Sequence, residues 1–256
     1  MQDCERVVAH LGAGTRFGPI RHLEETDSTN RVVAEAALAG APEGLVVVAD
    51  HQTAGRGRLG RRWDAAPGTA LLVSVLLRPS DLDASRYHLA GSAAALAAAA
   101  ACRRVGGFSP AVKWPNDLLV DDRKLAGILA ESNAGAVVVG IGLNLSAAPP
   151  GAVCAGQAAG RPVDGAALLA GLLGELDRRC GHWDEVAAEY GAACATVGRR
   201  VRVEASGTAR EGDAVAVDGD GRLVVDFGTG RLEALAAGDV VHLRGARAPL
   251  RPPPQA

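Results

Sequence analysis

The segment LVVVADHQTAGRGRLGRRW, from Leu45 to Trp63, joins an uninterrupted apolar run to a loop rich in glycine and arginine. Continuous β-branched residues up to Ala49 are typical of a strand that is buried on both faces of a sheet. The part from Gln52 to Trp63 contains three glycines, four arginines and no acidic side chain. Glycine lets backbone N–H groups approach a ligand, and arginine offers planar donor forks for carboxylates and phosphates. The segment therefore predicts a buried strand followed by an anion-binding loop, which we call the arginine loop (residues 55–63).

Two known phosphate-binding motifs match the arginine loop only in part. Its glycines fit the Gly-x-Gly-x-x-Gly spacing, but that fingerprint requires a helix directly after the glycines. Residues 61–68 are too few for such a helix and include a Pro-Gly pair. A Walker loop needs Lys and Ser/Thr after its last glycine, where this chain has Arg61-Arg62. A solvated basic loop and a Gly/Arg segment that binds nucleic acid stay open as alternatives.

Composition limits the classes of protein to consider. The 256 residues are 48% apolar, which suffices for a packed core in one large domain, or in a large and a small one. With 27 basic and 29 acidic residues, anion binding has to be local, and 3% aromatic residues are too few for a single-strand binder that stacks bases. Five scattered cysteines without metal-ligand spacing predict reduced thiols in the cytoplasm. The N-terminus predicts neither export nor a membrane span.

Apolar patterning along the chain predicts an alternation of strands and helices. Glycine and proline mark the ends of these elements. The predicted elements are a helical turn and loop over 1–19, a strand over 20–24, a helix after residue 30 that stops at Gly40, a strand over 71–77, a long Ala-rich helix over 84–105, a loop over 149–162, and helices over 165–180 and 183–193.

The residues before the first long helix allow two interpretations. Ser28, Thr29 and Asn30 are typical helix-capping residues, and capping alone would explain them. The alternative is that their hydroxyls and amide face a small polar ligand.

A second polar cluster follows the Ala-rich helix. Lys113-Trp114-Pro115-Asn116-Asp117 combines a lysine, an aromatic side chain and a proline turn before two polar side chains. Residues 118–131 read as a β-hairpin, with Lys124 at the start of its second arm. Lys124 either acts on a ligand or offsets the two aspartates beside it. Residues 137–144 predict another buried strand, whose two glycines indicate close approach of a backbone or a ligand.

The C-terminal part changes character at residue 197. Short alternating apolar runs, separated by turns, predict a small β-barrel or sandwich. The Pro-rich tail predicts a disordered end.

The order of these motifs closely resembles the biotin protein ligase family. The resemblance covers residues 20–145, and residues 197–245 are similar to the SH3-like C-terminal domain of that family. It implies an α+β fold, with a mixed β-sheet covered by helices as in class II synthetases, and a small SH3-like barrel. The predicted domains are 1–195 for catalysis, 196–246 for the barrel, and 247–256 for the tail. The matching motifs are Asp27-Ser28-Thr29-Asn30, Gln52 with the arginine loop, Lys113-Trp114-Pro115-Asn116-Asp117, Arg123-Lys124-Leu125-Ala126-Gly127-Ile128-Leu129 and Gly140-Ile141-Gly142-Leu143-Asn144.

The resemblance also implies an activity and a set of site residues. Biotin and ATP would form biotinyl-5'-AMP, and the biotinyl group would pass to a lysine of a biotin carboxyl carrier protein domain. We expect Mg²⁺ to help neutralise the leaving pyrophosphate, with no side chain assigned as a metal ligand. The expected catalytic residues are Lys124, Arg58 and Lys113. The expected biotin-binding residues are Ser28, Thr29, Asn30, Gln52, Gly55, Arg56, Gly57, Arg58, Lys124 and Gly127. The expected ATP-binding residues are Arg58, Arg61, Trp63, Lys113, Asn116, Lys124 and Asn144.

Further expectations concern partners and rival activities. Only about twenty-five residues precede Asp27, so we expect no winged DNA-binding domain, no repressor function and no DNA partner. A monomer or a weak homodimer is expected. A lipoate or octanoate ligase or transferase is the nearest rival, and a non-catalytic Gly/Arg nucleic-acid binder is the rival from another class.

Overall fold

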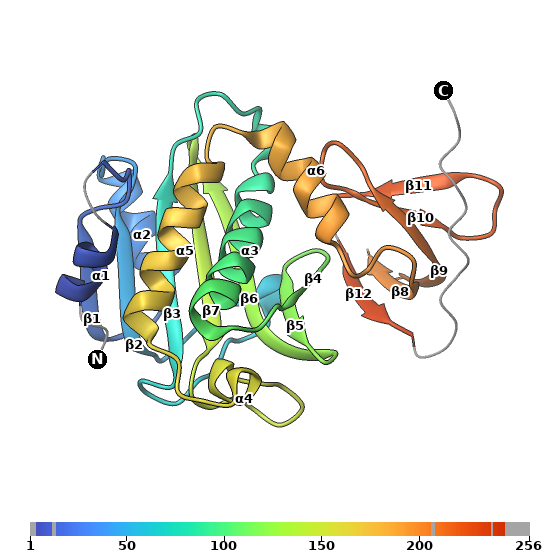
Figure 1. The fold of residues 1–256 in the computed structure, drawn as a ribbon. Coiled ribbons are helices and arrows are strands. Elements are labelled where there is room, and N and C mark those ends of the chain that lie inside the picture. Colours follow the sequence, from blue (N-terminus) through green and yellow to red (C-terminus); the bar gives the residue numbers. More distant parts are fainter. Residues whose placement is uncertain (1–3, 12–13, 206–207, 237, 244–256) are drawn as a thin grey trace.

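Two β-sheets organise the chain (Figure 1). The computed structural model describes all residues except 1–3, 12–13, 206–207, 237 and 244–256. The larger sheet is mixed and has the order β1-β2-β3-β7-β6-β5-β4, in which β1 and β2 are parallel and the other neighbours antiparallel. Its strands are β1 (Ile20–Thr26), β2 (Val46–Gln52), β3 (Ala70–Leu77), β4 (Ala111–Lys113), β5 (Asp117–Val120), β6 (Arg123–Asn133) and β7 (Ala136–Asn144).

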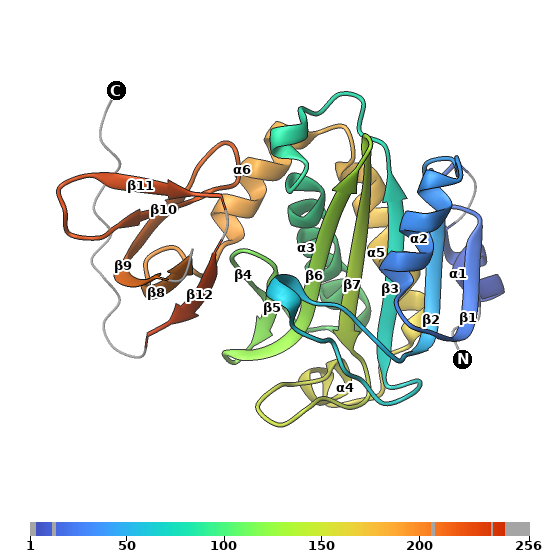
Figure 2. The ribbon, with the colours of Figure 1, turned by 180° about the vertical axis from the view of Figure 1, so that it is seen from behind.

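The two faces of the larger sheet are covered differently. Three long helices, α3 (Leu89–Ala101), α5 (Gly165–Arg179) and α6 (Trp183–Ala193), lie on one face, and α1 (Cys4–Leu11) packs beside α5 (Figure 1). The other face carries α2 (Thr29–Leu38) and the arginine loop, which includes the short turn η1 (Arg58–Gly60) (Figure 2). This second face is the one on which the polar side chains gather.

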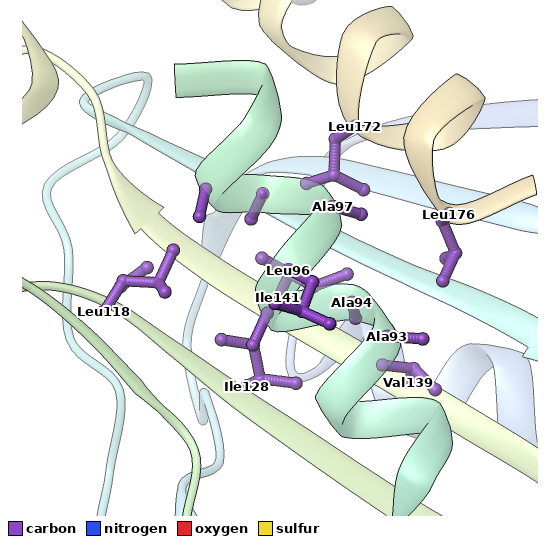
Figure 3. Close-up of a cluster of buried hydrophobic side chains, with 14 of the residues drawn as sticks. Ala93, Ala94, Leu96, Ala97, Leu118, Ile128, Val139, Ile141, Leu172 and Leu176 are labelled. Carbon is purple, nitrogen blue, oxygen red and sulfur yellow. The ribbon is translucent and has the colours of Figure 1, made fainter. Parts of the chain in front are cut away.

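The main core lies between the sheet and the long helices. Helix α3 is almost wholly buried, and its alanines let it fit closely between the strands and α5. Each larger apolar side chain buried here contributes about 1.5–3 kcal/mol relative to exposure. Figure 3 shows this packing with α3 (Ala93, Ala94, Leu96, Ala97), the strands (Leu118, Ile128, Val139, Ile141) and α5 (Leu172, Leu176).

A separate antiparallel sheet forms the C-terminal part. Its order is β11-β10-β9-β8-β12. Several contacts tie it to the rest of the chain. Among them, the Trp114 indole N–H donates to the Gly221 carbonyl (3.1 Å), and Thr196 Oγ1 lies 3.0 Å from His242 Nε2. Another joins His88 to the Asp220 carbonyl. The strands are β8 (Arg200–Ala205), β9 (Thr208–Val217), β10 (Leu223–Asp226), β11 (Leu232–Leu235) and β12 (Asp239–His242).

The structure confirms the predicted α+β class, the hairpin β5–β6 and the buried strands β2, β3 and β7. Two boundaries differ from the predictions. The Ala-rich helix begins at Leu89, because residues 84–86 form the separate turn η2, and it ends in a π-turn (Cys102–Gly106) before the left-handed Gly107. The predicted loop over 149–162 contains a short helix, α4 (Ala155–Ala159).

The predicted domain division stays a prediction. Residues 244–246 and the Pro-rich tail lie outside the described residues.

Candidate active site

A polar hollow of about 110 Å³ lies beside α2, beneath the arginine loop. The start of α2, the end of β2, the loop and the middle of β6 and β7 form its walls. Most of the expected site residues line this hollow, so the fold brings together segments that are distant in sequence. The lining residues include Ser28, Thr29, Asn30, Gln52, Arg56, Gly57, Arg58, Arg61, Trp63, Asn116, Lys124 and Gly127, all of which the sequence had indicated.

The polar side chains at the start of α2 line the hollow and do not cap the helix. Ser28 is the N-cap residue, but its side chain makes no capping hydrogen bond. Thr29 instead donates to Gln52 Oε1 twice, from its backbone N–H (2.8 Å) and its hydroxyl (2.9 Å). Capping alone is therefore the wrong interpretation of these residues.

Ser74 completes a buried network that the sequence did not reveal. It is fully buried in β3, and its Oγ lies 2.7 Å from Thr29 Oγ1 and 2.6 Å from Asn30 Oδ1. The Thr29 hydroxyl donates to Gln52, and the single Ser74 hydroxyl proton is shared between its contacts with Thr29 Oγ1 and Asn30 Oδ1. Because these protons are used inside the protein, the groups left for a ligand on this side are the Ser28 hydroxyl and Gln52 Nε2, which have no hydrogen-bond partner among the described residues.

Asn30 is held from several sides. Its Nδ2 donates to Glu131 Oε2 (2.8 Å), and its Oδ1 contacts Ser74. A Cβ at Gly140 would overlap this Oδ1, which explains why β7 has a glycine here. The prediction that a backbone or a ligand approaches this glycine is wrong, because the neighbour is the Asn30 side chain.

The arginine loop is folded back on itself. Gly57 N–H donates to the Arg61 carbonyl (2.7 Å), and Trp63 N–H donates to the Gly55 carbonyl (3.0 Å). Gly55 does not line the hollow; its Cβ position is occupied by the Trp63 carbonyl. At the tip, Leu59 adopts a left-handed backbone (φ 55°) and is 71% exposed.

The arginines of the loop reach different partners. Arg56 pairs with Glu131 (3.0 Å), which joins the loop to the Asn30 network. Arg61 pairs with Asp239 of β12 (3.1 Å), and Arg58 Nη1 donates to the Gly238 carbonyl (3.3 Å). Burial lowers the pKa of Arg58, and the charge of Arg61 lowers it further.

Lys124 lies at the other side of the hollow. Its Nζ is 2.7 Å from Asp117 Oδ1 and 5.6 Å from the centre of the Trp63 ring. Lys113 also faces Asp117, at 3.9 Å, but does not line the hollow. Asp117 is not among the expected site residues, although it belongs to the same motif as Lys113. Its carboxylate, four residues after that lysine, was the available signal.

Trp63 fills part of the hollow. A Cβ at Gly142 would lie 2.5 Å from its Cε2, and one at Gly127 would lie 3.1 Å from its Cζ3. The two glycines therefore form a flat floor for the indole. Its Nε1 is buried without a hydrogen-bond partner among the described residues.

Two amides hold the scaffold near the hollow. Asn116 Nδ2 donates to the Ile128 carbonyl (2.9 Å) and lines the hollow. Asn144 Nδ2 donates to the Val153 carbonyl (3.1 Å) and is 2% exposed. Asn144 lines a neighbouring hollow of about 450 Å³, which shares Gln52 and Arg62 with the first.

The hollow combines neutral polar groups with cations. Ser28 and Gln52 supply the neutral groups, and the loop arginines and Lys124 supply the positive charge. Such a site suits a ligand with a polar uncharged ring and an acidic tail, beside a second anion. Within the described part of the chain, no three His, Cys, Asp or Glu residues gather to hold a metal, and no helix has the length and apolar composition of a membrane span.

Comparison with known proteins identifies the family. Residues 23–146 match the biotin/lipoate A/B protein ligase family, and residues 196–243 match the biotin protein ligase C-terminal domain. The biotin--[acetyl-CoA-carboxylase] ligase of Mycobacterium tuberculosis is 39% identical over 91% of this chain and 92% of its own length. The chain belongs to the biotin protein ligase family. It is thus an enzyme of the ligase class.

Further similarities agree with this membership. A bifunctional ligase/repressor of Bacillus subtilis is 35% identical over 59% of this chain and 50% of its own length. The solved biotin protein ligase from Aquifex aeolicus in complex with biotin and ATP has a TM-score of 0.78 and 23% identity, covering 90% of this chain and 100% of that one. That likeness supports the fold.

Proposed function

We propose that this biotin protein ligase family member activates biotin with ATP as biotinyl-5'-AMP and then biotinylates a lysine of a biotin carboxyl carrier protein domain. The observation that carries the proposal is that one hollow is lined by neutral polar groups and by several cations. The 39% identical relative is a biotin--[acetyl-CoA-carboxylase] ligase by name, which supports the same substrate class.

We propose that the neutral polar groups of the hollow bind the ureido ring of biotin. A cyclic urea both donates and accepts hydrogen bonds, and leaving it unpaired in a pocket costs several kcal/mol, roughly 2–7 on transfer scales. We assign its direct recognition to the Ser28 hydroxyl and the Gln52 side-chain amide. Thr29 and Asn30 hold these groups in place, because their own polar atoms are used in the network with Ser74 and Glu131.

Activation requires two anions to meet. The biotin carboxylate attacks the α-phosphorus of ATP, the new C–O–P linkage forms, and pyrophosphate leaves. Two unit charges at 4 Å repel by about 4 kcal/mol at an effective dielectric near 20, which corresponds to roughly a thousandfold in rate. Lys124 and Arg58 are proposed to offset this repulsion, and Asp117 to orient Lys124 through their 2.7 Å contact.

The nucleotide is proposed to bind beside the loop. Trp63 offers a flat ring for the adenine once the indole leaves the floor of the hollow, and Arg61 offers a donor fork for the phosphates. Asn116 and Asn144 support this end from the scaffold, and Lys113 acts at a distance through Asp117.

Transfer follows from the same site. The uncharged amine of the acceptor lysine attacks the carbonyl carbon of the mixed anhydride, the amide bond forms, and AMP leaves with the electron pair of the broken C–O bond. The acceptor amine loses its proton in this step. The cations that screened the first step also stabilise the phosphate charge of the leaving AMP.

We assign no protein side chain as a ligand of Mg²⁺. Asp117, the acid beside the hollow, is already paired with Lys124 and lies 3.9 Å from Lys113. The described residues contain no group of three His, Cys, Asp or Glu side chains that could hold a metal ion. We therefore assign no step to the metal.

The decisive experiment is the exchange of pyrophosphate into ATP, with biotin and with lipoate in parallel. Exchange that depends on biotin supports the proposed activation, whereas exchange with lipoate alone assigns the chain to the rival activity. Biotin transfer to a purified carrier domain, with ATP omitted as a control, tests the second step. An ATP-independent signal would contradict it.

A further inference from the structure

The arginine loop touches the C-terminal sheet at two points. Both nitrogens of the Arg61 fork face the Asp239 carboxylate, at 3.1 and 3.3 Å, and Arg58 Nη1 donates to the carbonyl of the neighbouring Gly238. Asp239 is the first residue of β12. In Figure 2 the turn η1 lies over β5 and β6, on the side of the larger sheet that faces the C-terminal sheet. The loop therefore has an anchor in the other sheet as well as in its own.

Beyond its own backbone hydrogen bonds, the loop tip has little apolar packing to hold its conformation. Leu59 has a left-handed backbone, and its side chain is 71% exposed, so apolar packing does little to hold it there. A non-glycine residue in this region costs on the order of a kilocalorie per mole and persists only where its surroundings impose it. Arg58 and Arg61 also repel each other, and Asp239 is the acid that offsets both charges.

We propose that Asp239 is a positioning residue that holds Arg61, and with it the arginine loop, against β12 until an anionic ligand competes for the guanidinium. The inference rests on the proposed function, which identifies that anion as a nucleoside triphosphate. The Asp239 carboxylate occupies the donor fork of Arg61 in the way that phosphate oxygens would. The triphosphate can bind Arg61 only if the ion pair with Asp239 breaks. The C-terminal sheet therefore lowers the affinity for ATP.

The ion pair is not required to dock the two sheets. Other contacts join them, among them Trp114 with Gly221, His88 with Asp220, and Thr196 with His242. Removing the charge of Asp239 should therefore leave the sheets together and release only the loop.

The first test uses the unliganded protein and needs no activity. Limited trypsin digestion of the Asp239→Asn variant is compared with wild type and with Glu233→Gln, which breaks the ion pair with Arg210 in the same sheet, away from the loop. We expect cleavage at the loop arginines to quicken about two- to fivefold, the range that a partly exposed ion pair contributes, in Asp239→Asn alone. Equal cleavage in all three proteins overturns the proposal, independently of the adenylation and transfer steps proposed above.

The second test measures ATP. In biotin-dependent pyrophosphate exchange, Asp239→Asn should lower the KM for ATP by about two- to fivefold and leave kcat within about twofold, because the anion no longer competes with a carboxylate. The effect should shrink at high salt, where exposed pairs are screened. It should vanish in the Arg61→Met background. An unchanged KM, or a lower KM that persists in the Arg61→Met background, overturns the proposal. If the wild-type protein shows no exchange at all, the proposed function is refuted. The digestion experiment then decides the role of Asp239.

Discussion

Replacing Ser74 by alanine isolates the hydrogen-bond network beneath the polar hollow. Ser74 is fully buried, and its hydroxyl contacts Thr29 Oγ1 at 2.7 Å and Asn30 Oδ1 at 2.6 Å. The substitution opens almost no cavity but removes two contacts of about 1 kcal/mol each and leaves buried oxygens short of a donor. We expect the free energy of unfolding to fall by about 2–3 kcal/mol.

The same change should weaken biotin binding. Thr29 holds Gln52 through two hydrogen bonds, so a loosened Thr29 leaves the ligand-facing amide less well oriented. A loss of about 1.4 kcal/mol in binding would appear as a tenfold rise in Kd. Urea unfolding measures the stability, and calorimetric titration with biotin measures the affinity.

Ser92→Ala is the matched control. Ser92 is also buried, at 6% exposure, but lies in α3 on the opposite face of the sheet and has no side-chain hydrogen bond among the described residues. Its replacement should change stability by less than about 0.5 kcal/mol, since alanine suits a helix. If Ser74→Ala matches Ser92→Ala in both assays, the network does not organise the hollow and our reasoning is refuted.

Three further predictions follow from single residues. Lys124→Gln should slow biotin-dependent exchange by about a hundredfold or more, since one cation at the reacting oxygens is lost; a rate near wild type would remove Lys124 from the mechanism. Gly140→Ala should destabilise the fold by about 1–3 kcal/mol in a melting experiment, because its Cβ overlaps the Asn30 amide, whereas the open Gly174 should tolerate alanine. Burial lowers the pKa of His242 to about 4. Between this value and about 6.5 the unfolded chain binds more protons than the folded one, so the free energy of unfolding should fall as the pH drops from about 6.5 to 4. A urea midpoint of the wild-type protein that stays constant over this range would contradict the prediction.

Elements set by local pattern were predictable from the sequence. The β-branched run before the arginine loop and the turn between β5 and β6 carry their signals within a few residues, and both are confirmed. The start of α3 was predicted at Ala84, too early, because helix propensity does not distinguish a separate turn from the helix that follows it. The helix α4 was missed because Gly and Pro dominate its surroundings.

The partners of the site residues were not predictable. The lining residues came from motifs, but Ser74, Glu131 and Asp239 reach the site from strands that are far away in sequence. A serine in an apolar strand or an acid at the start of a strand gives no local signal for such a contact. These contacts arise from the register of the strands and from the position of the C-terminal sheet, which local sequence patterns do not indicate.

Helix α3 has a consequence for the opposite face of the sheet. Ile128 and Ile141 belong to the strands that floor the hollow, and their side chains pack with the alanines of α3 (Figure 3). The floor of the hollow is thus supported from behind by the alanine methyl groups of α3. A larger side chain in place of one of these alanines would displace the strands, so residues of α3 that do not line the hollow influence its depth.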